Sequence, residues 1–338
     1  MKHPLTKHFS HVLFLICSVL LIGCAFTPKN HSPGTHSPRA GDEIVVAGQF
    51  FHIGTPVVLW LDPDGYDAYR VERRFAPFDQ SDWKNSAATN KTLTTPNRYG
   101  LRASGLSWLE REKVRGGGWD LLTLQREVDQ FVIHYDASGT SRQCFKILHD
   151  NRCLSVHFML DLDGTIYQTL DLKERAWHAS IANTRSIGIE IANIGAYSNA
   201  DPLKRWYKKD NKDRTYIQIP PSHQPSGIRT KNFVARPARP EPIKGQIQGR
   251  ELLQYDLTRE QYEALAKLTA ALTRIFPYIT LDYPKDDSGN LIRSKLPDDQ
   301  LKSHRGLIGH YHIQSNKTDP GPAFQWNKLV RDAKKYLE

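Results

Sequence analysis

The chain has 338 residues, of which 39% are hydrophobic and 10% aromatic, and its formal net charge is +10. This composition excludes a disordered or fibrous protein, and the length suits one large domain or two small ones. The positive charge favours an anionic partner, such as nucleic acid, a membrane surface or an acidic polymer, without choosing among them.

The N-terminal segment has the organisation of a secretory signal. Two lysines and no acid precede an apolar run over residues 11–23. That run is shorter than the roughly 20 residues of a membrane-spanning helix. It ends in Leu-Ile-Gly-Cys, which resembles a bacterial lipobox. The resemblance implies removal of residues 1–23 and lipidation of Cys24; an ordinary signal or a short anchor is the alternative.

Two segments precede the main domain. Residues 24–41 are rich in Pro, Ser, Gly and His and have no apolar period, so we predict a flexible tether. Residues 42–120 begin with strand-like stretches at 43–51 and 55–62. We predict that they form a β-rich N-terminal extension that packs on the main domain.

The main domain is predicted to span residues 121–338, with strands first. QFVIHY at 130–135 is typical of a buried strand. SVHFMLDLDGTIYQTL at 155–170 predicts a hairpin that turns at Asp163-Gly164. SIGIEIANIG at 186–195 is a further apolar strand that contains one acid, Glu190.

Helices complete the domain. A short one is predicted over 141–150, and a long one over 258–276, where Thr258 and Gln261 form a capping box. A last helix is predicted from about Phe324. Alternating strands and helices predict the α/β class, with a mixed central β-sheet flanked by helices.

Two polar insertions interrupt the domain, at about 197–250 and 280–303. The first holds twelve Lys or Arg, four Asp or Glu and seven prolines. Long loops inside a domain are either functional or irregular and solvated.

Three side chains have the composition of an open zinc site. A catalytic zinc takes three protein ligands and leaves one position free. His134 ends a strand, His310 follows an apolar pair and a glycine, and Asp319 lies nine residues later. Each residue alone is more often structural than a ligand.

Two further side chains suit catalysis beside such a metal. Lys317 and Asp319 are two residues apart, so an extended segment presents both on one side. The lysine charge then stabilises an oxyanion. Placing the Glu190 carboxylate inside an apolar strand costs folding free energy if the group is buried and unpaired. It is either a solvent-facing or ion-paired glutamate, or a general base facing a pocket.

Two cysteines, Cys144 and Cys153, remain after the N-terminal segment. In an oxidising compartment they form a disulfide; two buried free thiols are the alternative. We predict the disulfide.

Five motifs, in order, carry a resemblance to a known family. They are VIHY at 132–135, SVHFMLDLDGTIYQ at 155–168, RAWHAS at 175–180, SIGIEIAN at 186–193 and GHYHIQSNKTDPGPAFQW at 309–326. Together they resemble the type 2 family of zinc-dependent N-acetylmuramoyl-L-alanine amidases, which is related to peptidoglycan recognition proteins and T7-type lysozyme. The resemblance covers about residues 126–335. It implies one zinc ion and cleavage between the lactyl group of N-acetylmuramic acid and L-alanine of the stem peptide.

The resemblance implies a role for each matching residue. His134, His310 and Asp319 match the zinc ligands, Glu190 the general base and Lys317 the oxyanion-stabilising lysine. Trp177 and His178 match a motif that lines the substrate groove, and His157 matches a structural position.

The chain also departs from the pattern. The loop from His310 to Asp319 is one residue shorter, and His312 stands where an acid is common. His304 is also close to His310 in the sequence. His304 and His312 are therefore alternative candidates for a zinc ligand. Ser180 replaces the usual glycine. The basic insertion at 197–250 has no counterpart in the family pattern. Three interpretations are open: a clamp on anionic wall material, a lid over the site, or a solvated loop.

The expected partner is peptidoglycan or muropeptides, and membrane contact is expected through the lipid anchor only. Ala25 after Cys24 favours the outer membrane, facing the periplasm. We expect a monomer and no nucleic acid, because the basic residues lack interleaved aromatics. The alternatives are a non-catalytic peptidoglycan-binding lipoprotein, a zinc peptidase that cuts within the stem peptide, and a structural envelope lipoprotein.

Overall fold

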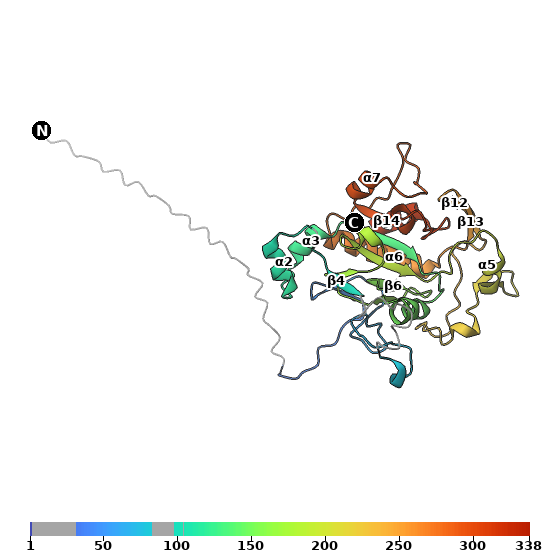
Figure 1. Ribbon diagram of the computed structural model, residues 1–338, viewed down its shortest axis with the longest axis horizontal. Helices are drawn as coiled ribbons and strands as arrows, with labels where there is room; N and C mark the ends of the chain where they lie inside the picture. The colour runs from blue at the N-terminus through green and yellow to red at the C-terminus, as the bar shows by residue number, and fades with distance from the viewer. Residues whose placement is uncertain (2–31, 83–97, 104) are drawn as a thin grey trace. The chain divides into compact units, whose positions relative to one another are not determined.

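The structure is a computed structural model that describes residues 1, 32–82, 98–103 and 105–338. The chain divides into two compact units, Met1–Pro38 and Arg39–Glu338. All of the described helices and strands lie in the second unit (Figure 1).

The predicted signal segment, apart from Met1, lies outside the described residues, as does Cys24. The described part of the predicted tether contains a turn, in which the Thr35 amide donates to the Ser32 carbonyl. Among the described helices, none has both the length and the apolar character needed to cross a bilayer.

A six-stranded mixed sheet forms the centre of the second unit, in the order β14-β5-β9-β6-β7-β3. In that order the strands span Gly306–Gly309, Gln130–Tyr135, Ser186–Ile191, Phe158–Leu160, Ile166–Gln168 and Val57–Leu59. Neighbours run parallel except β6 and β7, which form the predicted antiparallel hairpin. The predicted α/β class with a mixed central sheet is confirmed.

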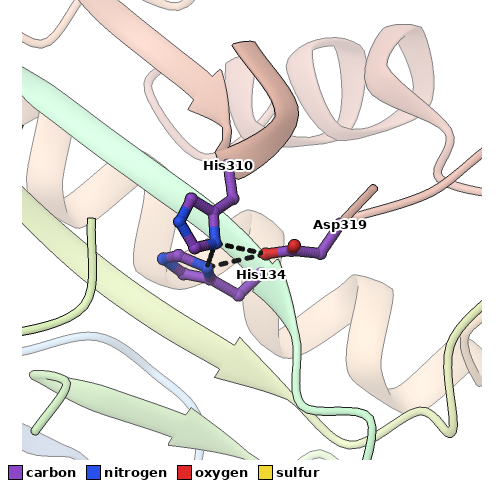
Figure 2. A group of neighbouring side chains, drawn as sticks. All are labelled: His134, His310 and Asp319. Atoms are coloured by element: carbon purple, nitrogen blue, oxygen red, sulfur yellow. Dashed lines mark hydrogen bonds and ion pairs between the residues drawn. The ribbon is translucent and has the colours of Figure 1, made fainter. Parts of the chain in front are cut away.

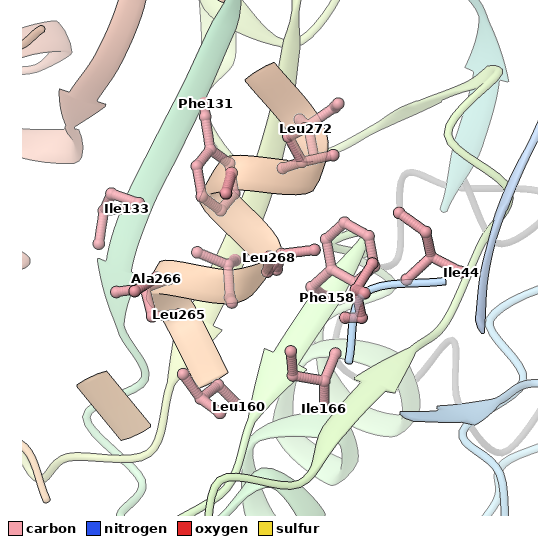
Figure 3. Close-up of a cluster of buried hydrophobic side chains, with 14 of the residues drawn as sticks. Ile44, Phe131, Ile133, Phe158, Leu160, Ile166, Leu265, Ala266, Leu268 and Leu272 are labelled. Carbon is pink, nitrogen blue, oxygen red and sulfur yellow. The ribbon is translucent and has the colours of Figure 1, made fainter. Parts of the chain in front are cut away.

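Helix α6 (Arg259–Ile275) covers one face of this sheet (Figure 3). The predicted capping box is present: the Gln261 amide donates to the Thr258 hydroxyl, and the Thr258 amide donates to the Gln261 side chain. Leu265, Leu268 and Leu272 are fully buried and pack with Phe131, Phe158 and Leu160 of the sheet. Each such leucine contributes roughly 1.5–3 kcal/mol to folding. Helix α9 (Trp326–Lys334), the predicted last helix, packs on α6.

The other elements are short. The remaining helices are α2 (Trp108–Arg115), α3 (Leu121–Glu127), α4 (Ser141–Phe145), α5 (Asp201–Trp206), α7 (Asp298–Ser303) and α8 (His310–Ile313). The 3₁₀ turns are η1 (Phe78–Gln80), η4 (Ser180–Ala182) and η5 (Pro221–His223), and η3 (Lys146–Asn151) is a π-helix. Antiparallel pairs join β1 (Glu43–Val46) to β2 (Gln49–His52), β4 (Tyr99–Leu101) to β8 (Glu174–Ala176), β10 (Tyr207–Lys209) to β11 (Thr215–Ile217), and β12 (Ile243–Ile247) to β13 (Arg250–Gln254).

The predicted boundary at residue 120 does not separate two compact units. Strand β3 pairs in parallel with β7 and forms one edge of the central sheet. Ile44 and Val46 of β1 are fully buried in the same core as α6. The segment 42–120 therefore belongs to the main unit, and it contains a helix, α2, besides its strands.

Arg102 fastens this segment to the domain. Its side chain is completely buried, although arginine is rarely found in that state. The guanidinium donates hydrogen bonds to the backbone carbonyls of Leu172, Asn183, Thr184 and Ser186. Burial lowers the pKa of Arg102 to about 9, so the group remains charged at neutral pH.

Replacing Arg102 by methionine should lower the free energy of unfolding by about 3 kcal/mol or more, because buried carbonyls are left without a donor. Urea denaturation measures the loss. Arg115→Met is the matched control: Arg115 is exposed and, among the described residues, forms an ion pair with Glu112 alone, so the stability lost should be within about 1 kcal/mol. Equal losses in both variants would contradict a fastening role for Arg102.

The disulfide predicted between Cys144 and Cys153 is not formed, since both are buried free cysteines. Cys144 lies on α4 in an apolar cluster with Phe145 and Met159. Cys153 follows the π-helix at a positive φ of 55°, close enough to Arg98 for the arginine charge to act on its thiol. Spacing along the chain did not reveal these different surroundings.

Candidate metal and catalytic site

The three predicted ligands come from two neighbouring strands and one loop. His134 lies near the end of β5, and His310 begins α8 directly after β14. These strands pair in parallel with Ile133 opposite Gly309, so the register brings the two histidines side by side. Asp319 comes from the loop after α8, where its carbonyl accepts a hydrogen bond from the Tyr311 amide.

The ligand atoms converge on one point (Figure 2). Asp319 Oδ2 lies 2.8 Å from His134 Nδ1 and 3.0 Å from His310 Nδ1, and the two Nδ1 atoms are 3.0 Å apart. All three residues are buried. Zinc–nitrogen bonds of 2.0–2.1 Å in a tetrahedron place ligand atoms about 3.3 Å apart, so a small expansion accommodates the ion.

Hydrogen bonds behind the histidines show that the donor set fits a cation. His310 Nε2 lies 2.7 Å from Gln314 Oε1, which only accepts, so this nitrogen carries the proton. His134 Nε2 lies 3.1 Å from His178 Nδ1, and His178 Nε2 lies 3.3 Å from the Ser186 hydroxyl. With His134 protonated on Nε2, both Nδ1 lone pairs face the Asp319 carboxylate. A positive ion between these three groups removes their mutual repulsion.

The ionisation states agree with this arrangement. Burial, with a contribution from His310, lowers the pKa of His134 to about 4, so the ring is neutral at pH 7. Burial acts to raise the pKa of Asp319. Positive charge at His310 and hydrogen bonds donated by His134 and His310 outweigh it and hold this pKa well below its ordinary range; a cation in place of those protons acts in the same direction. A neutral imidazole and an ionised carboxylate are the forms that bind a metal.

Glu190 stands beside this cluster. It lies on β9 directly opposite His134 of β5 in the parallel register. Burial is the main cause that raises the pKa of Glu190 well above its ordinary value, and the charges of Asp319 and Asp136 add to it. No described residue forms a hydrogen bond or ion pair with its carboxylate, which excludes the ion-paired alternative within the described part of the chain.

Lys317 supplies a positive charge to the same site. Its backbone amide donates to the Gln314 carbonyl, which fixes the turn that leads to Asp319. Burial is the main cause that raises the pKa of Glu190, and the Lys317 charge partly offsets this rise. Burial is also the main cause that lowers the pKa of His134, and the same lysine charge adds to that lowering. The predicted grouping of base, ligands and cation is therefore present in space.

The two alternative histidine ligands lie elsewhere. His312 is fully buried; its Nδ1 accepts from the Gly309 amide, and its Nε2 lies 2.7 Å from the Ile292 carbonyl. His304 Nε2 lies 3.0 Å from the Leu307 carbonyl. Both imidazole rings therefore form hydrogen bonds with the backbone. Neither histidine belongs to the cluster of His134, His310 and Asp319.

The predicted groove residues differ in their contacts. His178 lies behind His134 as its hydrogen-bond partner, which sequence reasoning did not anticipate. Trp177 is partly buried under the guanidinium of Arg175, 4.5 Å from the ring centre. His157, predicted to be structural, is fully buried, and its Nδ1 accepts from the Gly188 amide.

A second group of acids and a histidine, Asp42, Glu43 and His52, is a weaker candidate. The Glu43 carboxylate accepts from the Ala40 and Gly41 amides, and Asp42 is paired with the exposed His52. These carboxylate oxygens are already used as hydrogen-bond and ion-pair partners, so we assign the group no metal.

Comparison with known proteins identifies the family of the chain. The sequence model of the family described as Amidase_2, N-acetylmuramoyl-L-alanine amidase, matches residues 124–322, more than half of the chain. The chain belongs to this family. The match includes all of the metal-ligand candidates together with Glu190 and Lys317. It supports an amidase that acts on peptidoglycan.

Solved structures similar to this Amidase_2 member include a Se-Met AmpD derivative, at 17% identity over 70% of this chain and 90% of that one, with a TM-score of 0.32. The E. coli amidase AmiD, in complex with anhydro-N-acetylmuramic acid-L-Ala-D-gamma-Glu-L-Lys, is 18% identical over 61% of this chain and 57% of that one, with a TM-score of 0.36. The endolysin LysCS of Clostridium intestinale URNW is 15% identical, covers 64% and 88%, and has a TM-score of 0.29. A search of curated proteins found no match.

A hairpin at the end of the basic insertion of this amidase-family chain contacts the loop that carries Asp319. The hairpin joins β12, inside the insertion, to β13, which extends beyond residue 250 and ends at Gln254. The Gln254 side-chain amide donates to the Pro320 carbonyl, and its oxygen accepts from the Ala323 amide. At the hairpin turn, Gln248 donates to the Tyr311 carbonyl. These contacts hold both sides of the segment that carries Asp319, the third candidate ligand. This part of the insertion is ordered, which excludes the solvated-loop alternative for the hairpin.

Gln314 was missed by sequence reasoning, although its spacing of four residues after His310 is a usable signal. We expect Gln314→Leu to weaken zinc affinity by about 10- to 100-fold, because His310 loses the acceptor that orients it. Gln314→Glu keeps an acceptor and serves as the control. Competition with a chromogenic chelator measures both affinities, and wild-type affinity in the leucine variant would contradict the orienting role.

Proposed function

We propose that the chain is a zinc-dependent peptidoglycan hydrolase that cleaves the amide between the lactyl group of N-acetylmuramic acid and L-alanine of the stem peptide. The convergence of His134, His310 and Asp319 beside Glu190 carries this proposal. Membership of the N-acetylmuramoyl-L-alanine amidase family supports the choice of bond.

His134, His310 and Asp319 would hold the zinc ion. When bound, zinc supplies the Lewis acidity that favours ionisation of water and polarises the scissile carbonyl. Glu190 accepts the proton of the attacking water, a role that its raised pKa suits, and then delivers it to the leaving L-alanine nitrogen. The charge of Lys317 stabilises the oxyanion that develops on the carbonyl oxygen. Burial of the ligands limits competing contact with bulk water.

The test is digestion of purified peptidoglycan by the full chain, with products identified by mass spectrometry, with and without a chelator. Chelator-sensitive release of free stem peptides that begin with L-alanine, together with peptide-free glycan, supports the proposal. Fragments cut inside the stem peptide would indicate a zinc peptidase instead. Binding without release would indicate a recognition module.

We also propose that the protein is anchored to the outer membrane through a lipid on Cys24, because Leu-Ile-Gly-Cys ends the apolar N-terminal run. Cys24→Ser should leave the protein unlabelled by a fatty-acid probe and release it from the membrane fraction. Undiminished labelling of this variant would refute the anchor.

A further inference from the structure

An arginine-lined cavity lies apart from the metal site. It is open to solvent and has a volume of about 730 Å³ between the segment 64–75, α4 with β7, and residues 224–229 of the basic insertion. Arg74, Arg142 and Arg229 line it, one from each of these parts, and Asp64 is the only acid among the described residues of its lining. None of the catalytic or ligand residues contributes to it.

The central arginine is held in place by packing. The Arg142 guanidinium lies 4.1 Å from the ring centre of Phe75. Gly227, at a positive φ of 84°, brings the insertion so close that an added Cβ would meet Arg142 Cβ at 3.0 Å and Tyr66 Oη at 3.1 Å. The contact with Phe75 restricts the guanidinium, so less side-chain entropy is lost when it binds a ligand.

The charge of the cavity is poorly balanced. Among the described residues, neither Arg142 nor Arg229 forms an ion pair. In the described part of the chain, the ion pair of Arg74 is a long one, 3.9 Å, with the largely exposed Asp64. Three cations gathered around one space repel one another, and a multivalent anion relieves that repulsion.

We propose that this cavity binds a phosphate group, as a phosphate ester or a diphosphate. Guanidinium groups match phosphate oxygens in paired hydrogen bonds. A phosphate that carries two charges also balances three arginines better than a single carboxylate does. Tyr66 and Tyr167, stacked at 4.2 Å and almost completely buried, form part of the base of the cavity. The proposal does not depend on the proposed amidase function.

Titration calorimetry with pyrophosphate tests the site. The full chain is first freed of metal by dialysis against a chelator and then against buffer, so that phosphate cannot bind through zinc. Arg142→Gln and Arg229→Gln should each weaken binding at least about 10-fold, as expected for loss of a charge-assisted hydrogen bond. Arg250→Gln, an exposed arginine of the same insertion, should leave binding unchanged.

Three results would overturn the proposal. They are no binding of pyrophosphate by the wild type at millimolar concentration, equal weakening by Arg250→Gln, and acetate binding as tight as that of pyrophosphate. Arg229 is exposed, so its variant keeps the test valid if Arg142→Gln fails to fold. Peptidoglycan digestion by Arg229→Gln should equal that of the wild type, which separates this site from the amidase site.

Two sources of phosphate are then distinguished with vesicles of phosphatidylglycerol or phosphatidylcholine. The apolar N-terminal run can insert into either, so only the difference between wild type and the Arg142→Gln/Arg229→Gln double variant counts. Loss of retention on phosphatidylglycerol alone supports a lipid headgroup. Equal retention together with lost pyrophosphate binding supports a soluble phosphate ester.

Discussion

Glu190→Gln is expected to lower kcat by about 10²- to 10⁴-fold, the usual contribution of a general acid–base group. The substitution keeps the shape of the side chain and removes only its ability to exchange a proton. Zinc content should stay at that of the wild type, because Glu190 is not among the convergent ligand atoms. Peptide release from peptidoglycan and elemental analysis measure the two quantities on the same samples.

Stability separates this effect from misfolding. Burial raises the pKa of Glu190, so its ionised form costs folding free energy at neutral pH, and neutral glutamine removes that cost. The free energy of unfolding should therefore be unchanged or higher in Glu190→Gln. Glu263→Gln, which alters an exposed glutamate on α6, is the control and should retain full activity. Near wild-type kcat in Glu190→Gln would exclude the general-base role.

The pH profile of the wild type follows from the same group. A general base works only when ionised, so kcat/KM should fall as the pH drops through the pKa of Glu190. Because that pKa is raised, the acid limb should lie well above pH 4.5, the ordinary value for a glutamate. A limb at or below that value would contradict either the raised pKa of Glu190 or its assignment as the base.

Asp319→Asn is expected to reduce zinc affinity by more than about 100-fold, a larger effect than the loss of an orienting group has. The amide has nearly the same size but lacks the negative charge that the two histidines face at 2.8 and 3.0 Å. Amidase activity should fall in parallel and recover in part when excess zinc is added.

Asp299→Asn, on the exposed surface of α7, is the control and should bind zinc as the wild type does. Chelator competition followed by elemental analysis gives both affinities. If Asp319→Asn retained one tightly bound zinc per chain, a different third ligand would have to complete the site.

The sequence predicted the parts of the site that local patterns determine. The apolar runs around His134 and Glu190 indicated strands β5 and β9, and the capping box at Thr258 located α6. The grouping of ligands was predictable because the motifs resemble those of a known family. Order along the chain could not show that β5, β9 and β14 are neighbours in the sheet.

Long-range contacts explain what was missed. Arg102 looks like any surface arginine in the sequence, and only the folded chain places four carbonyls around it. The role of His178 depends on the approach of His134, 44 residues away. The two cysteines were predicted to pair because their spacing allows it, yet spacing does not determine where the thiols lie.

Strand β3 has a practical consequence for anyone who shortens this chain. Cutting at residue 124, where the family match begins, removes β3 and leaves β7 as a bare sheet edge. An unpaired edge recruits strands from other molecules, so the trimmed protein should aggregate even though its ligand residues are all present. Homology boundaries drawn from sequence thus cut through one folding unit, and a well-behaved fragment should start no later than Arg39.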